Sequence, residues 1–115
     1  MSFWRRDIIQ PALHHAIQAE MAEQFAILGR EPDNARAHFA LGTLNHFQGG
    51  TEEAIRLYLR AIELDPSYAA PHISLGRIYA VKGLYDEAWK HAREAERLGD
   101  RSLVAQLERY SAPSN

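Results

Sequence analysis

Residues 35–68 read ARAHFALGTLNHFQGGTEEAIRLYLRAIELDPSY, and residues 69–102 read AAPHISLGRIYAVKGLYDEAWKHAREAERLGDRS. The second segment repeats the first at a spacing of 34 residues, because small, apolar and turn-forming residues recur in register. Nine pairs are identical at this spacing: Ala35/Ala69, His38/His72, Leu41/Leu75, Gly42/Gly76, Gly49/Gly83, Glu53/Glu87, Ala54/Ala88, Ala61/Ala95 and Leu64/Leu98. Such a period is typical of solenoids, in which each helix–turn–helix unit needs neighbours to cover its apolar face. The sequence therefore predicts an all-α fold, an antiparallel helix–turn–helix solenoid.

Helix breakers and capping residues divide the repeated region into four expected helices, over residues 33–48, 51–64, 67–82 and 86–98. Asp33 or Asn34 is expected to cap the first of them, because both side chains carry an oxygen that accepts from a free backbone N–H. Thr51 is expected to cap the second helix in the same way, and Ser67 is expected to begin the third.

The first 34 residues do not form a clear third repeat. Pro11 suits the first position of a helix, and apolar residues then recur at three- and four-residue steps until Gly29. This pattern predicts one amphipathic helix over residues 11–29 that covers the first repeat. Two interpretations stay open for residues 1–10: packing against the same domain, or contact with a second subunit or another neighbour. The large apolar residues of this stretch are Phe3, Trp4, Ile8 and Ile9.

Two matching sets of residues resemble the tetratricopeptide repeat (TPR), whose signature is Trp-x2-Leu-Gly-x2-Tyr followed by Ala-x3-Phe, Ala and Pro. The first unit supplies His38, Leu41, Gly42, Asn45, Ala54, Tyr58, Ala61 and Pro66. The second supplies His72, Leu75, Gly76, Tyr79, Ala88, Ala92 and Ala95. The resemblance covers 68 of 115 residues. It departs from the signature where His38 and His72 replace tryptophan and Asn45 replaces tyrosine.

The resemblance implies a right-handed superhelix in a single domain spanning residues 1–115. Within it we expect an N-terminal segment with a packing helix (1–32), repeat 1 (35–68), repeat 2 (69–102), a C-terminal capping helix (103–110) and a tail (111–115). Glycine and alanine in the signature are expected where helices cross closely.

A concave groove is the binding surface that the resemblance implies, lined by the first helix of each repeat. By register, its residues are Arg36, Phe39, Thr43, His46, Phe47, Ile73, Arg77 and Val81. This surface is largely apolar with a few cationic groups, which suits an apolar peptide or an amphipathic helix with an occasional carboxylate. It does not resemble the carboxylate-clamp subgroup, because Phe39, Thr43 and Ile73 stand where that clamp has lysine or asparagine.

Composition narrows the function classes. The net charge is −2, so we expect neither nucleic-acid binding nor attraction to an anionic membrane. No apolar run is long enough for a membrane span or a secretory signal. The absence of cysteine excludes a disulfide framework and a thiolate nucleophile, and it fits a reducing compartment. We therefore expect a cytoplasmic protein.

Catalytic and metal-binding motifs are not found. The six histidines show no HExxH pattern and no His-x3-His pair, and there is no phosphate-binding loop. Glu87, His91 and Glu94 share one helix face. This spacing favours a solvent-exposed face with ion pairs over a set of metal ligands. We expect no enzyme activity, no cofactor and no metal site.

Two functional hypotheses follow. The first is a protein–protein interaction module, a scaffold or adaptor that binds a partner's peptide or helix in the groove. The alternative is a self-assembly element, a homodimer or larger oligomer in which the N-terminal helix or a second copy of the chain fills that groove.

Overall fold

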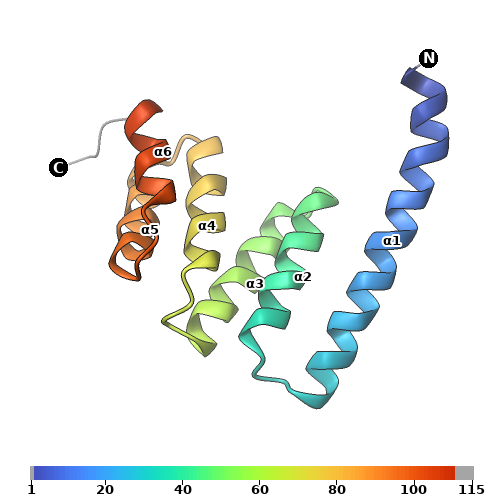
Figure 1. The fold of residues 1–115 in the computed structure, drawn as a ribbon, viewed down its shortest axis with the longest axis horizontal. Helices are drawn as coiled ribbons and strands as arrows, with labels where there is room; N and C mark the ends of the chain where they lie inside the picture. Colours follow the sequence, from blue (N-terminus) through green and yellow to red (C-terminus); the bar gives the residue numbers. More distant parts are fainter. Residues whose placement is uncertain (1, 111–115) are drawn as a thin grey trace.

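The computed structural model describes the backbone of residues 2–110 and the side chains of residues 11–109. The described residues form six helices and no strand (Figure 1). In chain order these are α1 (Ser2–Arg30), α2 (Ala35–Phe47), α3 (Thr51–Leu64), α4 (Ala70–Val81), α5 (Tyr85–Arg97) and α6 (Ser102–Tyr110). The prediction of an all-α helical repeat is confirmed.

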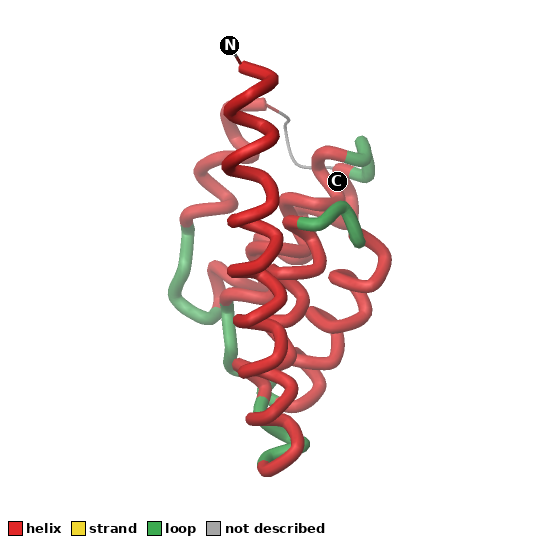
Figure 2. Tube along the Cα trace, turned by 90° about the vertical axis from the view of Figure 1, so that its right-hand side faces the viewer, coloured by secondary structure: helices red, strands yellow, loops and turns green. Residues whose placement is uncertain are grey.

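Each helix packs against the next one in the chain, so that α2 with α3 and α4 with α5 form the two expected helical hairpins. At the ends of this array, α1 packs on α2, and α6 packs on both α5 and α4. Figures 1 and 2 show the result: a row of neighbouring helices with the long α1 at one end and α6 at the other.

The turns inside the two hairpins depend on glycine at equivalent positions. Gly49 and Gly83 have φ angles of 84° and 79°, in the left-handed region that other residues rarely adopt. Before α2, the side chain of Asn34 accepts a hydrogen bond of 2.9 Å from the backbone N–H of Ala37. Asn34 is therefore the N-cap, and Asp33 is not.

The N-terminal helix differs from the expectation. We expected a helix beginning at Pro11, but α1 is continuous from Ser2 to Arg30 and contains Pro11 in its interior. Proline there lacks the N–H that would bond to the carbonyl four residues earlier, so this position is an unfavourable one within a helix. The open question of how the side chains of residues 1–10 pack lies outside the described residues.

Two predicted helix starts are also wrong. Thr51 is the first residue of α3 rather than its cap, and Gly50 occupies the cap position without a side-chain hydrogen bond. Ser67 lies in the turn before α4, where the Asp65 carboxylate accepts hydrogen bonds from its backbone N–H (3.1 Å) and its hydroxyl (2.6 Å). This local turn uses the groups that would otherwise begin the helix, so α4 starts only at Ala70.

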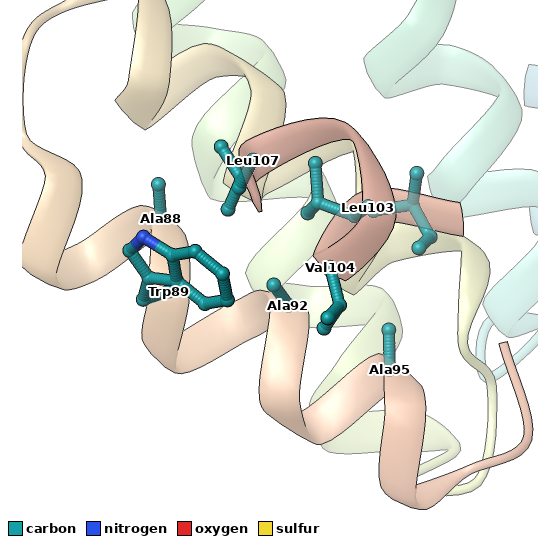
Figure 3. Packing of buried hydrophobic residues seen from close by; sticks show 8 residues of the cluster. Ala88, Trp89, Ala92, Ala95, Leu103, Val104 and Leu107 are labelled. Carbon is teal, nitrogen blue, oxygen red and sulfur yellow. The ribbon is translucent and has the colours of Figure 1, made fainter. Parts of the chain in front are cut away.

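Small residues occupy the helix crossings, as the repeat predicts. Five alanines of α3 and α5 have no exposed surface: Ala54, Ala61, Ala88, Ala92 and Ala95. A Cβ atom on Gly42 would lie 2.7 Å from Cε1 of Tyr58, and one on Gly76 would overlap the side chain of Leu103. The core of the second repeat then closes under α6, where Trp89 packs with Leu107 (Figure 3).

Candidate functional site

A groove with a volume of about 590 Å³ lies between α2 and α4, with α3 contributing to its base. Its lining residues are Phe39, Thr43, His46, Phe47, Thr51, Tyr58, Ser74, Arg77, Ile78, Val81 and Lys82. The volume falls within the range of ligand pockets, and most of the surface that lines the groove is apolar. Among the described residues, no residue of α1 lines this groove.

The floor of the groove is fixed by aromatic packing. Tyr58 of α3 is buried, and its hydroxyl lies 3.0 Å from the hydroxyl of Thr43 on α2. The two hydroxyl groups therefore form a hydrogen bond with each other between the two helices. The Phe39 ring packs against both Tyr58 and Tyr68, with centroids 5.4 Å apart in each pair. These contacts hold the floor in one conformation, so the groove is preformed.

The open end of the groove exposes two large apolar side chains at equivalent positions near the ends of α2 and α4. Phe47 is 74% exposed and Val81 is 90% exposed. Burying such surface against an apolar partner is favourable by about 25 cal/mol per Å² removed from water. These two side chains are where a partner would gain the most contact area.

Cationic groups stand at the rim. Arg77 is exposed on α4, and its Nε donates a hydrogen bond of 3.2 Å to the side-chain oxygen of Gln106 on α6. Lys82 forms an ion pair of 2.9 Å with Glu52 from the start of α3. The hydrogen bond and charge of Lys82 lower the pKa of the Glu52 carboxyl from its ordinary value. Gln106 orients Arg77 while leaving its terminal nitrogens able to meet a carboxylate.

Six of the eight residues that the sequence assigned to the groove lie in it: Phe39, Thr43, His46, Phe47, Arg77 and Val81. Arg36 does not, because its guanidinium stacks over the Tyr68 ring at 4.8 Å from the centroid. Ile73 does not either, because it is buried with Leu103 and Val104 in the core that α6 closes. Their assignment to the groove is corrected accordingly.

Five lining residues were not on the predicted list: Thr51, Tyr58, Ser74, Ile78 and Lys82. Of these, Tyr58 carried a signal in the sequence, since it stands at the aromatic position of the Ala-x3-Phe element after Ala54. Ser74 was also indicated, because the repeat register places it on the groove side of the same helix as Arg77. The other three carry no comparable signal, because their approach to the groove depends on how α3 and the end of α4 are rotated.

Three histidines of the repeats make side-chain hydrogen bonds. His38 donates through Nε2 to the carbonyl oxygen of Pro32 at 3.1 Å, and His72 and His91 lie against each other between α4 and α5. Within residues whose side chains are described, no group of three or more histidine, aspartate or glutamate residues is placed to hold a metal. The face of His91 and Glu94 instead carries a Glu94–Arg97 ion pair.

Comparison with known families addresses the identity of this helical array. A family model described as TPR repeat matches residues 47–83, from the end of α2 through α3 and α4. This part of the chain is therefore similar to a TPR repeat. No curated protein matches the sequence significantly. The matched region contains the turn residues Gly49 and Gly83, the crossing alanines of α3, and much of the groove lining.

TPR repeats generally mediate protein–protein interactions and are generally not catalytic. None of the helices in the described part of the chain is long and apolar enough to cross a bilayer.

Proposed function

We propose that this protein is a scaffold or adaptor that binds a peptide or helix of a partner protein in the groove between α2 and α4. The observation that carries the proposal is the pairing of a preformed aromatic floor with two strongly exposed apolar side chains, Phe47 and Val81. A preformed groove needs little ordering on binding, so more of the contact energy is retained as affinity.

The chemistry of the partner follows from the lining. The apolar floor selects a segment with two or three apolar side chains on one face, as in an amphipathic helix or an extended peptide. Arg77, held by Gln106, supplies a guanidinium that selects a carboxylate and fixes the direction of the bound segment. We expect neither catalysis nor a cofactor in this role, and we place the protein in the cytoplasm as part of the same proposal.

Selection of binders from a library of random peptides tests the proposal, with affinities measured by fluorescence polarisation. Enriched peptides are expected to share apolar residues at helical or alternating spacing together with an acidic residue. Phe47→Ser and Val81→Ser should each raise the Kd about tenfold or more, because each removes exposed contact area at no cost to the core. Arg77→Ala should weaken only peptides that contain the carboxylate, and it should leave the thermal midpoint almost unchanged.

Leu59→Ser is the matched control, since Leu59 is also an exposed apolar residue, 41% accessible, but does not line the groove. Affinities that respond equally to Leu59→Ser and Phe47→Ser would place the binding surface elsewhere. Binders that lack apolar spacing and acidic residues would contradict the proposed partner chemistry.

A further inference from the structure

Two permanently cationic residues line the groove, and each is held by a side chain that does not line it. Arg77 of α4 donates from Nε to the side-chain oxygen of Gln106 on α6, at 3.2 Å. Lys82, the residue after α4, lies with its Nζ 2.9 Å from the carboxylate of Glu52 on α3. The neighbour of Arg77 is therefore an uncharged amide, whereas the neighbour of Lys82 is an anion.

The two cations lie on opposite edges of the face that α4 turns toward the groove. Arg77 and Lys82 differ by about 140° around the helix axis at 3.6 residues per turn. Ile78 and Val81 point between these two directions and also line the groove. α4 packs against α6 on one side and against α3 on the other (Figure 1). A bound segment would therefore meet Arg77 along the α6 edge of the groove and Lys82 along the α3 edge.

The charge of Lys82 is already compensated. Glu52 stays ionised at neutral pH, because the hydrogen bond and the charge of Lys82 lower the pKa of its carboxyl. A carboxylate of a partner would have to displace Glu52, or approach an ion pair whose net charge is near zero. The α3 edge of the groove thus offers a carboxylate little attraction.

Arg77 keeps its charge available. No ion pair joins it to an acidic side chain within residues 11–109. Hydrogen bonds from Ser102, and to a smaller extent the charge of Arg77, lower the pKa of the Asp100 carboxyl. This carboxylate is engaged at the start of α6, where it accepts from the Ser102 backbone N–H at 2.9 Å. Because Gln106 occupies only Nε, the two terminal nitrogens of Arg77 form a fork that matches a carboxylate.

We infer that Gln106 is a specificity-determining residue of the groove, because its uncharged amide directs a partner's carboxylate to Arg77 rather than to Lys82. Gln106 acts through Arg77 and is therefore a positioning residue. It gives α6, which closes the core of the second repeat, a part in recognition. The inference rests on the proposed binding of a peptide in the groove, and it specifies which edge of the groove binds the acidic residue.

Fluorescence polarisation with a matched pair of peptides tests the inference on the full chain. The probes are the tightest acidic peptide from the library selection and a twin in which glutamine replaces its acidic residue. The wild type is expected to bind the acidic peptide about three- to fivefold more tightly than the twin, which is the size of an exposed charge pair. Gln106→Glu should reduce this preference to near unity, because the new carboxylate pairs with Arg77 as Glu52 pairs with Lys82. The Kd of the neutral twin should not change, since the apolar floor is intact.

Two comparisons separate an effect through Arg77 from a general effect of added negative charge. Ala105→Glu places the same charge at a neighbouring exposed position of α6 and should leave the preference at its wild-type value. In an Arg77→Ala background, Gln106→Glu should have no further effect on the preference, because the residue through which it acts is gone. An unchanged thermal midpoint in each variant shows that the helical array remains folded.

A wild-type preference retained by Gln106→Glu, an equal loss in Ala105→Glu, or a further effect of Gln106→Glu in the Arg77→Ala background would overturn the inference. In each of these cases Phe47→Ser would still weaken both peptides, so peptide binding in the groove would stand. If the selection returns no acidic peptide, the inference and the proposed partner chemistry both fail. If Phe47→Ser changes the affinity of neither peptide, the proposed binding site is wrong and the inference falls with it.

Discussion

His72 of α4 and His91 of α5 form a hydrogen bond between their Nδ1 atoms, which lie 2.9 Å apart. One Nδ1 must carry a proton and the other must not, so the two rings are held in complementary states. The ring of Tyr79 stacks on His91 with centroids 5.6 Å apart, and His72 is almost fully buried. Burial, with a smaller contribution from the positive charge of His72, lowers the pKa of His91 from 6.5 to about 4.

This pair predicts a pH-dependent stability. Below pH 6.5 the unfolded chain binds a proton at His91 that the folded chain binds only near pH 4, so protonation favours unfolding in this window. The pKa of His72 is also lowered by burial, and this acts in the same direction. The thermal midpoint is therefore expected to be constant above about pH 7 and to fall as the pH decreases from 6.5 toward 4.

His91→Phe is the variant that isolates the effect, and its thermal midpoint should change less between pH 6.5 and 4.5 than that of the wild type. His14→Gln, at an exposed position of α1, should leave the wild-type slope unchanged. Equal slopes for wild type and His91→Phe would mean that the pair does not couple protonation to folding.

Gly42 predicts a large cost for side-chain insertion between α2 and α3. Its Cβ position lies 2.7 Å from Cε1 and 2.9 Å from Cδ1 of Tyr58, whose own position is fixed by Thr43. Gly42→Leu should lower the free energy of unfolding in urea by about 1–3 kcal/mol. Gly29→Leu is the control, because nothing lies within 4 Å of a Cβ there. If the Gly42 variant is as stable as the Gly29 variant, α2 and α3 do not approach closely at Gly42.

Substitutions at Gly76 and Leu103 are expected to have non-additive effects on the free energy of unfolding. A Cβ on Gly76 would overlap Cδ2 of Leu103, which is 1% exposed. Leu103→Ala should cost about 2–5 kcal/mol by leaving a cavity, whereas Gly76→Ala should destabilise by overpacking. The double variant is expected to lose less than the sum of the two single variants, because the added methyl occupies vacated space. Strictly additive losses in urea unfolding would show that the two sites do not touch.

Loss of the Asn34 side chain at the start of α2 is expected to reduce the stability of the protein. Its side chain accepts from the Ala37 N–H at 2.9 Å, and replacing an N-cap by alanine removes that acceptor. Asn34→Ala should therefore cost about 1 kcal/mol in urea unfolding. Asp33→Ala is the neighbouring control and should be close to neutral. The opposite order of the two effects would make Asp33 the cap.

The 34-residue period predicts some of the groove residues correctly and others wrongly. Phe39 and Ile73 are equivalent in the 34-residue period, and the sequence assigned both to the groove. Phe39 lines it, but Ile73 is buried in the core. The difference arises because α6 packs directly against α4 and draws Ile73 into the core, whereas α2 and α4 enclose the groove between them. A period relates one repeat to the next and takes no account of the different neighbour at the end of the array.

Local chemistry in the sequence determined where the helices of the repeats turn and where they cross. Glycines at equivalent positions make the hairpin turns, and alanines at the period allow close crossings, so these features needed no long-range information. Tertiary structure alone decided which distant side chains meet. His72 with His91, Arg77 with Gln106 and Lys82 with Glu52 are pairs on different helices, and each depends on the rotation and offset of helices whose packing involves the whole array. Backbone preferences act over a few residues, whereas these contacts depend on how side chains of several helices fill one volume.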